Sequence, residues 1–215
     1  MAVDLLADAY AGTSRAVAAL APEDWERPTR AAAWPVRALL HHQLVDAQRA
    51  LVALACTTDA APDVDRTTYW ADFLPDGDAG AGLSARVAAA YDDPADLRAQ
   101  WTATATAVVR ASGAADPTTR VETQGHVITV DDLVSTLVVE ATVHHLDLVL
   151  DLDDPGPSAA CLAHTRAVLE RILGDPLPAS WDDGTAVLRS TGREALDDAD
   201  RAALGVRAGR LPLLG

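Results

Sequence analysis

Apolar residues recur at helical spacing along most of the chain. Residues 2–21 contain no proline and are rich in Ala and Leu, which predicts a first amphipathic helix. Residues 36–55 predict a second helix, and Pro35 stands where helices often begin. The apolar stripe of this second helix consists of Val36, Leu40, Leu44, Ala47 and Leu51. Two long helices are therefore expected near the N-terminus.

The middle of the chain begins with a polar stretch, residues 57–82, which is punctuated by Pro and Gly. A loop of this length within a compact domain is usually functional or mobile. It contains three aromatic residues, Tyr69, Trp70 and Phe73. Two interpretations stay open for them: they cap a pocket, or they pin the loop to the rest of the fold.

Two further elements are predicted before the central helix of the chain. Residues 83–112 predict a third helix that is broken at Pro94. Residues 120–130 predict two short strands that turn at Gln124-Gly125. Residues 131–152 then predict a fourth helix that is apolar at nearly every angle, as expected of a helix buried inside a bundle. Asp131 is expected to cap it, with Thr129 as the competing cap.

The last part of the chain differs in character. Residues 158–173 predict a fifth helix that ends at Gly174. Residues 185–192 predict a strand and residues 196–205 a short helix.

The predicted fold class is mainly α. A chain of 215 residues suits one large domain, or a domain with a small appendage. We expect a helical bundle over residues 1–174 and a small α+β appendage over residues 175–215.

The fourth predicted helix carries a line of ionisable residues. Glu140, His144, Asp147 and Asp151 recur at steps of three and four, so they share one face of a helix. Such groups are costly to bury among Leu and Val unless they are paired, hydrogen-bonded or bound to a metal. The spacing of Glu140 and His144 suits two ligands of one divalent ion, and it also suits a simple ion pair.

The other two members of the line have different expected roles. Asp147 either accepts a hydrogen bond from the ring N–H of a metal-bound histidine, or pairs with an arginine. Asp151 is expected to be solvated near the helix end.

Spacing alone does not identify a third ligand. His41 and His42 lie early in the second predicted helix, and the helical wheel does not choose between them. Both also fit a partly exposed pair, or a histidine bound to Asp46 one turn on. His126 in the hairpin is a further candidate, whereas His145 points away from the line of Glu140 and His144.

Composition excludes several classes of function. The net charge of −15 argues against binding to nucleic acid or to an anionic membrane surface. All seventeen basic residues are Arg, so Schiff-base and pyridoxal-phosphate chemistry, which need a lysine amine, are excluded. Cys56 and Cys161 form no Cys-x-x-Cys pair, and without a signal peptide they indicate a reducing cytoplasm. The fourth predicted helix carries too many charges to span a bilayer.

The sequence lacks the motifs of two common catalytic classes. There is no Gly-x-Ser-x-Gly elbow of a serine hydrolase. Neither a Gly-x-Gly-x-x-Gly turn nor a Gly-Lys-Ser/Thr phosphate loop is present, so nucleotide chemistry is not expected.

Three blocks of sequence resemble mycothiol-dependent maleylpyruvate isomerase-like proteins. The first, residues 28–43, contains Pro-Thr, a Trp and a Val-Arg-x-Leu-Leu-x-His run in that order. The second, residues 121–148, contains a hairpin followed by Glu-x-x-x-His-x-x-Asp. The third block is the tail, with LRSTGREALDDADRAALG and the closing LPLLG. The order of the three blocks makes the resemblance specific.

The resemblance implies a DinB-like four-helix bundle and a metal, usually zinc, held by His, Glu and His. These family positions correspond to His42, Glu140 and His144 in this sequence. His42 is chosen over His41 because it is the last residue of the Val-Arg-x-Leu-Leu-x-His run. The doubled histidine, and Pro35 directly after Trp34, depart from the family pattern.

The resemblance also implies a thiol chemistry. Three protein ligands leave an open position on zinc, and a coordinating thiol is deprotonated there. Mycothiol, the small thiol of actinobacteria, is the expected cosubstrate rather than Cys56 or Cys161. Its thiolate adds to an electrophilic carbon of a small substrate, and either elimination after bond rotation or release of the adduct follows.

Several points stay open from the sequence. Anionic groups on the thiol or acceptor need arginine partners, and the catalytic candidates are Arg37, Arg66 and Arg193. The short C-terminal part leaves the electrophile unassigned. A metal-binding stress or regulatory protein without turnover, or a metal-dependent hydrolase, are the alternatives. A monomer and a homodimer are both compatible with the sequence, and the metal could be nickel or iron instead of zinc.

Overall fold

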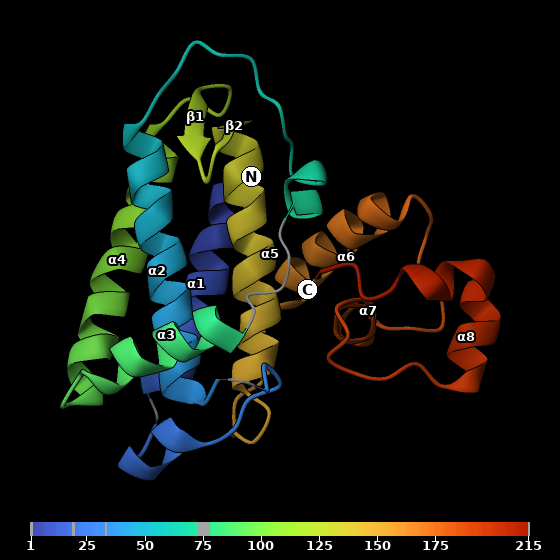
Figure 1. Cartoon of the computed structure of the whole chain (residues 1–215), viewed down its shortest axis with the longest axis horizontal. Helices are drawn as coiled ribbons and strands as arrows, with labels where there is room; N and C mark the ends of the chain where they lie inside the picture. The colour runs from blue at the N-terminus through green and yellow to red at the C-terminus, as the bar shows by residue number, and fades with distance from the viewer. Residues whose placement is uncertain (1, 19, 33, 73–77, 215) are drawn as a thin grey trace.

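Four long helices form the body of the molecule. The computed structural model describes residues 2–18, 20–32, 34–72 and 78–214. Helices α1 (Ala2–Ala18), α2 (Val36–Ala55), α4 (Pro94–Ala114) and α5 (Val130–Leu148) stand side by side as a bundle (Figure 1). Each packs against two of the others, because α2 contacts α4 and α5 while α1 contacts α4 and α5. The predicted mainly-α class and four-helix bundle are thus confirmed.

The first two predicted helices are present. The first ends at Ala18, and the second runs from Val36 to Ala55 as predicted, with Pro35 as its N-cap. Between them, a short 3-10 helix, η1 (Pro22–Glu26), buries Trp25.

The predicted break at Pro94 is also present. Helix α3 (Asp78–Ala89) packs across α2 and begins earlier than predicted, and α4 starts at Pro94. The Asp93 side chain accepts a hydrogen bond from the backbone N–H of Ala95, which caps the new helix. Within the predicted loop, residues 68–72 form a second 3-10 helix, η2 (Thr68–Asp72). Phe73 lies outside the described residues.

The predicted hairpin leads directly into α5. Strands β1 (Arg120–Thr123) and β2 (His126–Thr129) pair antiparallel, and Gln124 and Gly125 have φ angles of 50° and 86°. Such left-handed angles at two adjacent residues are those of a tight hairpin turn. Thr129, the last strand residue, accepts a hydrogen bond from the backbone N–H of Asp132 and caps α5.

The prediction that Asp131 caps α5 was therefore wrong. The helix begins at Val130, one residue earlier than the prediction assumed, so Asp131 is already in the first turn. There its carboxylate pairs with Arg66 at 2.5 Å, and the neighbouring Asp132 pairs with the same guanidinium at 2.6 Å. Both carboxylates lie at the helix N-terminus, where negative charge is favourable.

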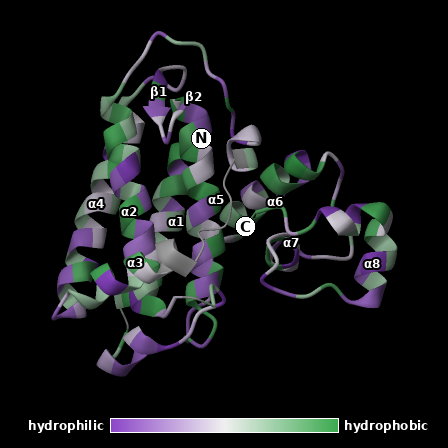
Figure 2. Cartoon of the chain, in the orientation of Figure 1, coloured by the Kyte–Doolittle hydropathy of each residue, from purple (hydrophilic) through white to green (hydrophobic). Residues whose placement is uncertain are grey.

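Helix α5 lies between two apolar clusters. Leu133, Leu137 and Val138 face the larger cluster inside the bundle, which includes the buried Trp101. Val139 and Val143 face a smaller cluster formed with the C-terminal part of the chain. Because apolar side chains cover both of its sides, α5 is buried along most of its length, and apolar residues colour it heavily in Figure 2. Any polar group on its inner face must find a partner within the protein.

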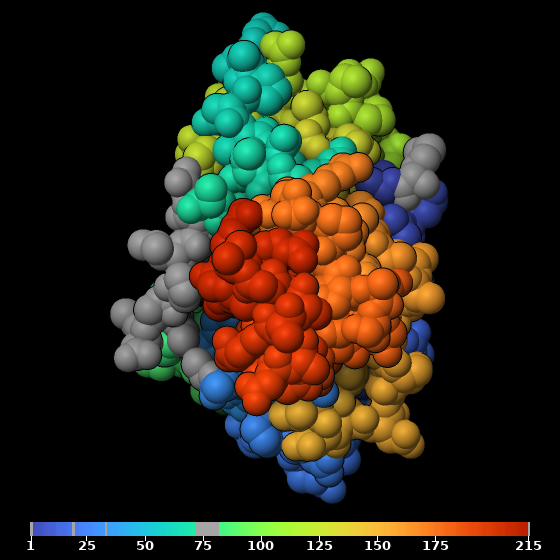
Figure 3. Space-filling model, turned by 90° about the vertical axis from the view of Figure 1, so that its right-hand side faces the viewer, coloured from blue at the N-terminus to red at the C-terminus, as the bar shows by residue number. Residues whose placement is uncertain are grey.

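The C-terminal part packs on the outside of α5. Helix α6 (Ala159–Leu173) is capped by Ser158 and ends at Gly174, whose φ of 80° is left-handed, as predicted. Helices α7 (Asp183–Ser190) and α8 (Asp198–Leu204) and a 3-10 helix, η3 (Gly205–Arg210), follow. Together they form one face of the molecule (Figure 3). The division of domains at residue 174 stays a prediction.

The strand predicted over residues 185–192 was wrong, because this segment is helix α7 and the turn after it. Asp182 caps the helix by accepting a hydrogen bond from the backbone N–H of Thr185. Ala186, Val187 and Ser190 are buried, which is the i, i+1, i+4 pattern of a helix. The appendage is consequently helical over its described residues, and the short helix predicted over residues 196–205 is present as α8.

None of the helices in the described ranges has the length and apolar character needed to cross a bilayer.

Gly12 of α1 packs tightly against the ring of His145 on α5. A Cβ added at the buried Gly12 would lie 2.8 Å from Cε1 of the His145 ring, whereas one at Gly113 of α4 would meet only Val3 at 3.7 Å. We expect Gly12→Ala to lower the free energy of unfolding by about 1–3 kcal/mol through overpacking. The matched control Gly113→Ala should raise it by about 0.5–1 kcal/mol through helix propensity. Urea unfolding followed by circular dichroism measures both, and equal stabilisation by the two variants would contradict the close approach.

Candidate metal centre

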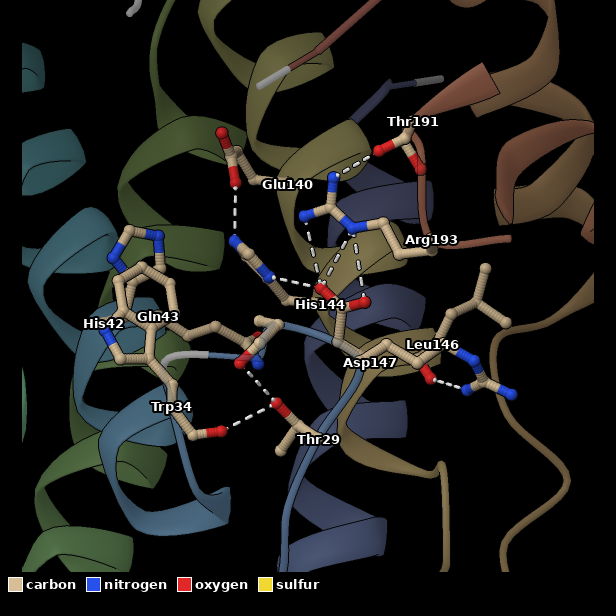
Figure 4. Close-up of polar contacts among 12 residues, drawn as sticks. Thr29, Trp34, His42, Gln43, Glu140, His144, Leu146, Asp147, Thr191 and Arg193 are labelled. Atoms are coloured by element: carbon tan, nitrogen blue, oxygen red, sulfur yellow. Dashed lines mark hydrogen bonds and ion pairs between the residues drawn. The ribbon is translucent and has the colours of Figure 1, made fainter. Parts of the chain in front are cut away.

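Two neighbouring helices bring three potential metal-binding side chains together. His42 lies in the second turn of α2, and Glu140 and His144 lie on adjacent turns of α5. One donor atom from each of the three residues lies within 4.8 Å of the other two. In Figure 4, Glu140 lies above His144 and His42 lies to its left, and the rings of His42 and His144 are edge to face at 4.9 Å. The three residues implied by the resemblance therefore meet at one point.

The imidazole of His144 is held at both nitrogens. Its Nδ1 lies 3.0 Å from Oδ2 of Asp147, and its Nε2 lies 3.1 Å from Oε2 of Glu140. Asp147 has no solvent exposure, and it also contacts the guanidinium of Arg193. Asp147 therefore contacts both kinds of partner that the sequence left open, a histidine and an arginine. With Nδ1 hydrogen-bonded to Asp147, Nε2 is the atom that faces Glu140 and His42.

The electrostatics of the three residues are interdependent. Burial opposes the charged form of His144, but hydrogen bonds to Asp147 and Glu140 outweigh it and raise its pKa to about 9. Burial and the nearby His144 lower the pKa of His42 to about 3. Burial would raise the pKa of Glu140, but His144 holds it below its ordinary value. When no metal is bound, the protonated ring of His144 thus pairs with two carboxylates, those of Glu140 and Asp147.

A second charged pair lies one turn further along α2. Oδ2 of Asp46 is 3.3 Å from Nε2 of His42, and its Oδ1 is 2.8 Å from Nη1 of Arg49. Burial and the neighbouring Glu140 raise the pKa of Asp46 to about 7. The sequence predicts Asp46 only as a partner for a histidine, and it gives no prediction for Arg49. The signal that could have found both is their spacing from His42, four and then three residues, which keeps all three on one face.

These side chains open onto a cavity of about 230 Å³. Its wall is built from α2, η2, the hairpin turn, α5 and the C-terminal part of the chain. The lining residues are Trp34, His42, Asp46, Arg49, Ala50, Tyr69, Trp70, Thr123, Gln124, Leu133, Thr136, Leu137, Val139, Glu140, Val143, His144, Arg193 and Leu214. The cavity is mixed in character, with charged groups around the three donors and aliphatic side chains along α5.

Two of the three loop aromatics, Tyr69 and Trp70, show both features that the sequence left open. Tyr69 and Trp70 line the cavity, so they help to close it. They are also pinned: the hydroxyl of Tyr69 accepts a hydrogen bond of 2.5 Å from Gln124, and the indole N–H of Trp70 donates to the carbonyl of Arg66 at 2.9 Å. Arg66 in turn holds Asp131 and Asp132. The described part of the loop is therefore tied to the start of α5.

The remaining histidines lie away from the three donors. His41 is 3.0 Å from the hydroxyl of Ser84 on α3. His126 pairs with Asp63 at 3.1 Å in the hairpin. His145 points to the opposite side of α5 and meets Asp154 at 3.1 Å.

The three candidate arginines lie in different parts of the structure. Arg37 pairs with Glu26 at 3.0 Å, and Arg66 pairs with the first turn of α5; neither lines the cavity. Arg193 alone of the three lines it. Asp151, the last residue of the predicted line, follows α5 in a turn and is exposed, as expected.

Comparison with known protein families gives a match that covers most of the helical bundle. The family model described as mycothiol maleylpyruvate isomerase N-terminal domain matches residues 6–149, which include most of α1, all of α2 to α5 and all three donors. No curated protein and no solved structure matches the chain.

The raised pKa of His144 predicts how metal binding depends on pH. Below about pH 9 a metal must displace the His144 proton, so the apparent affinity should rise about tenfold per pH unit from pH 6 to 8 and level off above 9. His42, with its pKa of about 3, does not compete in this range. Competition titrations with a chromophoric chelator measure this slope. His41→Ala should keep this slope, because His41 faces Ser84 and not the three donors. An affinity independent of pH would contradict the prediction.

Proposed function

The chain belongs to the mycothiol maleylpyruvate isomerase N-terminal domain family, and on that premise we propose that it is a metal-dependent thiol transferase or isomerase. The proposed metal is zinc and the proposed cosubstrate is mycothiol. The observation that carries this proposal is the convergence of His42, Glu140 and His144 at the wall of a cavity.

The donor set fits zinc. Two imidazole nitrogens and one carboxylate oxygen are ligands that zinc prefers, and donors around a tetrahedral zinc lie about 3.3 Å apart. The distance of 3.1 Å between Nε2 of His144 and Oε2 of Glu140 is close to that value. Three protein ligands leave one position open, which is the arrangement of catalytic rather than structural zinc sites. The hydrogen bond from His144 to Asp147 is the support that metal-bound histidines usually have.

The thiol must come from outside the chain. Cys161 is buried, Cys56 is exposed at the end of α2, and the described lining of the cavity contains neither. When bound, the metal supplies a position at which a thiol is held as its thiolate. The carboxylate of Asp46 reaches the cavity and does not hold His144, so we assign it to accept the thiol proton.

The cavity suits a small electrophile beside the thiol. Leu137, Val139 and Val143 offer apolar contact, and Thr123 and Gln124 offer hydrogen bonds at the hairpin end. The thiolate adds to an electrophilic carbon of the acceptor. Rotation about the resulting single bond and elimination of the thiolate would give a cis–trans isomer, whereas return of the proton from Asp46 to the carbanion and release of the adduct would give S-transfer. With a net charge of −15, we propose a cytoplasmic protein without a nucleic-acid partner.

Two alternative functions would require a different arrangement or a different reactant beside the three donors. A protein that only stores or senses metal needs no space beside its ligands, and the cavity next to the three donors favours turnover. A hydrolase would use water in place of the thiol at the same open position. Dependence of turnover on added thiol therefore separates it from the proposed enzyme.

The adjacent histidines of α2 give a matched test of the metal site. We expect the wild type to hold about one divalent ion per chain and His42→Ala to lose it on dialysis, because two ligands alone hold zinc weakly. His41→Ala should keep the ion, since His41 faces Ser84 instead of the cavity. Elemental analysis measures all three proteins. Wild type without stoichiometric metal, or His42→Ala with the same content, would contradict the proposal.

The proposed activity is tested by comparing turnover with different thiols and without a thiol. Consumption of a small activated electrophile is measured with mycothiol, glutathione, bacillithiol or no thiol. We expect turnover with mycothiol to fall at least about 100-fold in His144→Ala, because a catalytic metal contributes several kcal/mol. Asp46→Asn should lower turnover while keeping its metal. Equal rates with and without thiol would instead identify a hydrolase.

A further inference from the structure

The turn after α7 presents one arginine to the metal centre. The backbone N–H groups of Arg193 and Glu194 both donate to the carbonyl of Leu188, at 2.8 and 3.2 Å. Gly192 in this turn has a φ of +73°, and a Cβ there would approach Pro212 to 3.2 Å. The N–H of Leu213 donates to the carbonyl of Ser190 at 2.8 Å. The end of the chain therefore fixes the direction in which Arg193 leaves the turn.

The guanidinium of Arg193 contacts both oxygens of the Asp147 carboxylate. Nε lies 3.3 Å from Oδ1 and 3.4 Å from Oδ2, Nη2 lies 3.3 Å from Oδ2, and Nη1 donates to the carbonyl of Thr191 at 2.9 Å. Oδ2 is also the atom that faces Nδ1 of His144 at 3.0 Å. Figure 4 shows the resulting chain of contacts from Thr191 through Arg193, Asp147 and His144 to Glu140. All three nitrogens of this guanidinium are engaged by the protein itself.

We propose that Arg193 is a positioning residue for the metal centre. It fixes the carboxylate of Asp147, and Asp147 fixes the ring of His144 so that Nε2 points toward Glu140 and His42. The inference rests on the proposed metal site. Arg193 lies beyond residue 149, where the family match ends, so the C-terminal appendage completes a centre whose donors all come from the matched part.

The surroundings of Asp147 explain why a second partner is needed. The carboxylate is fully buried, and a buried carboxylate that binds one imidazole keeps lone pairs that require donors. From the opposite side of the residue, the backbone N–H of Arg30 donates only to its carbonyl oxygen, at 3.2 Å. Without Arg193, Asp147 is free to rotate away from Nδ1, and the orientation of His144 is lost. Groups that orient a metal-bound histidine in this way typically change metal affinity 10- to 100-fold.

A matched control exists within the same appendage. Arg189 pairs with the nearly buried Asp200 and stacks over Trp181, but it touches neither Asp147 nor the cavity. Removing its guanidinium should loosen the appendage without acting on His144. Comparing Arg193→Gln with Arg189→Gln therefore separates positioning of the metal ligand from general support of the fold.

The experiment measures Co²⁺ and Zn²⁺ affinity of the purified full chain by chelator competition, with the Co²⁺ absorption spectrum and thermal melts in parallel. We expect Arg193→Gln to weaken both affinities by about 10- to 100-fold and to change the Co²⁺ spectrum. Arg189→Gln should lower the melting temperature while its affinity stays within about twofold of wild type. Wild-type affinity and spectrum in Arg193→Gln, or an equal loss in Arg189→Gln, would overturn the inference.

A double variant tests whether Arg193 acts through Asp147. Asp147→Asn combined with Arg193→Gln should bind metal no more weakly than Asp147→Asn alone, because both changes break one chain of contacts. This pair also replaces a buried ion pair by two neutral amides, so it guards against misfolding of Arg193→Gln from an unpaired carboxylate. Additive losses would overturn the inference. A wild type that binds no metal would defeat the proposed function, whereas wild-type binding that Arg193→Gln leaves unchanged would defeat this inference alone.

Discussion

The structure depends on one line of charge along α5, in which the imidazole of His144 lies between the partly exposed carboxylate of Glu140 and the buried carboxylate of Asp147. Two carboxylates inside an apolar helix are unfavourable unless positive charge stands between them. In the metal-free protein that charge is a proton on His144, and a divalent ion would supply more of it. The other parts of the centre, His42 on α2 and Arg193 beyond α7, complete this line from either side.

Much of this arrangement could be predicted because it follows local rules. The steps of three and four residues on α5 identified Glu140, His144 and Asp147, since helical periodicity alone puts them on one face. The break at Pro94, the turn at Gln124-Gly125 and the end of α6 at Gly174 follow from backbone preferences of Pro and Gly.

What could not be predicted depends on contacts between distant segments. His41 and His42 are equivalent on the helical wheel, and only packing of α3 against α2 gives His41 a partner in Ser84. The segment 185–192 has the apolar residues of a strand, but Asp182 starts a helix there and the core covers its inner face. The ion pair between Arg193 and Asp147 connects residues that lie 46 positions apart in the sequence. No helix or strand periodicity predicts a contact over that separation.

The composite wall of the cavity has a consequence for how the family can diversify. The donors come from α2 and α5, whereas Trp70, Gln124 and Leu214 come from a loop, a hairpin turn and the chain's end. Exchanges at these peripheral positions reshape the space for an acceptor and leave the ligand geometry in place. The shape of the cavity and the positions of the three donors are therefore set by different segments, so the cavity can change without moving the donors.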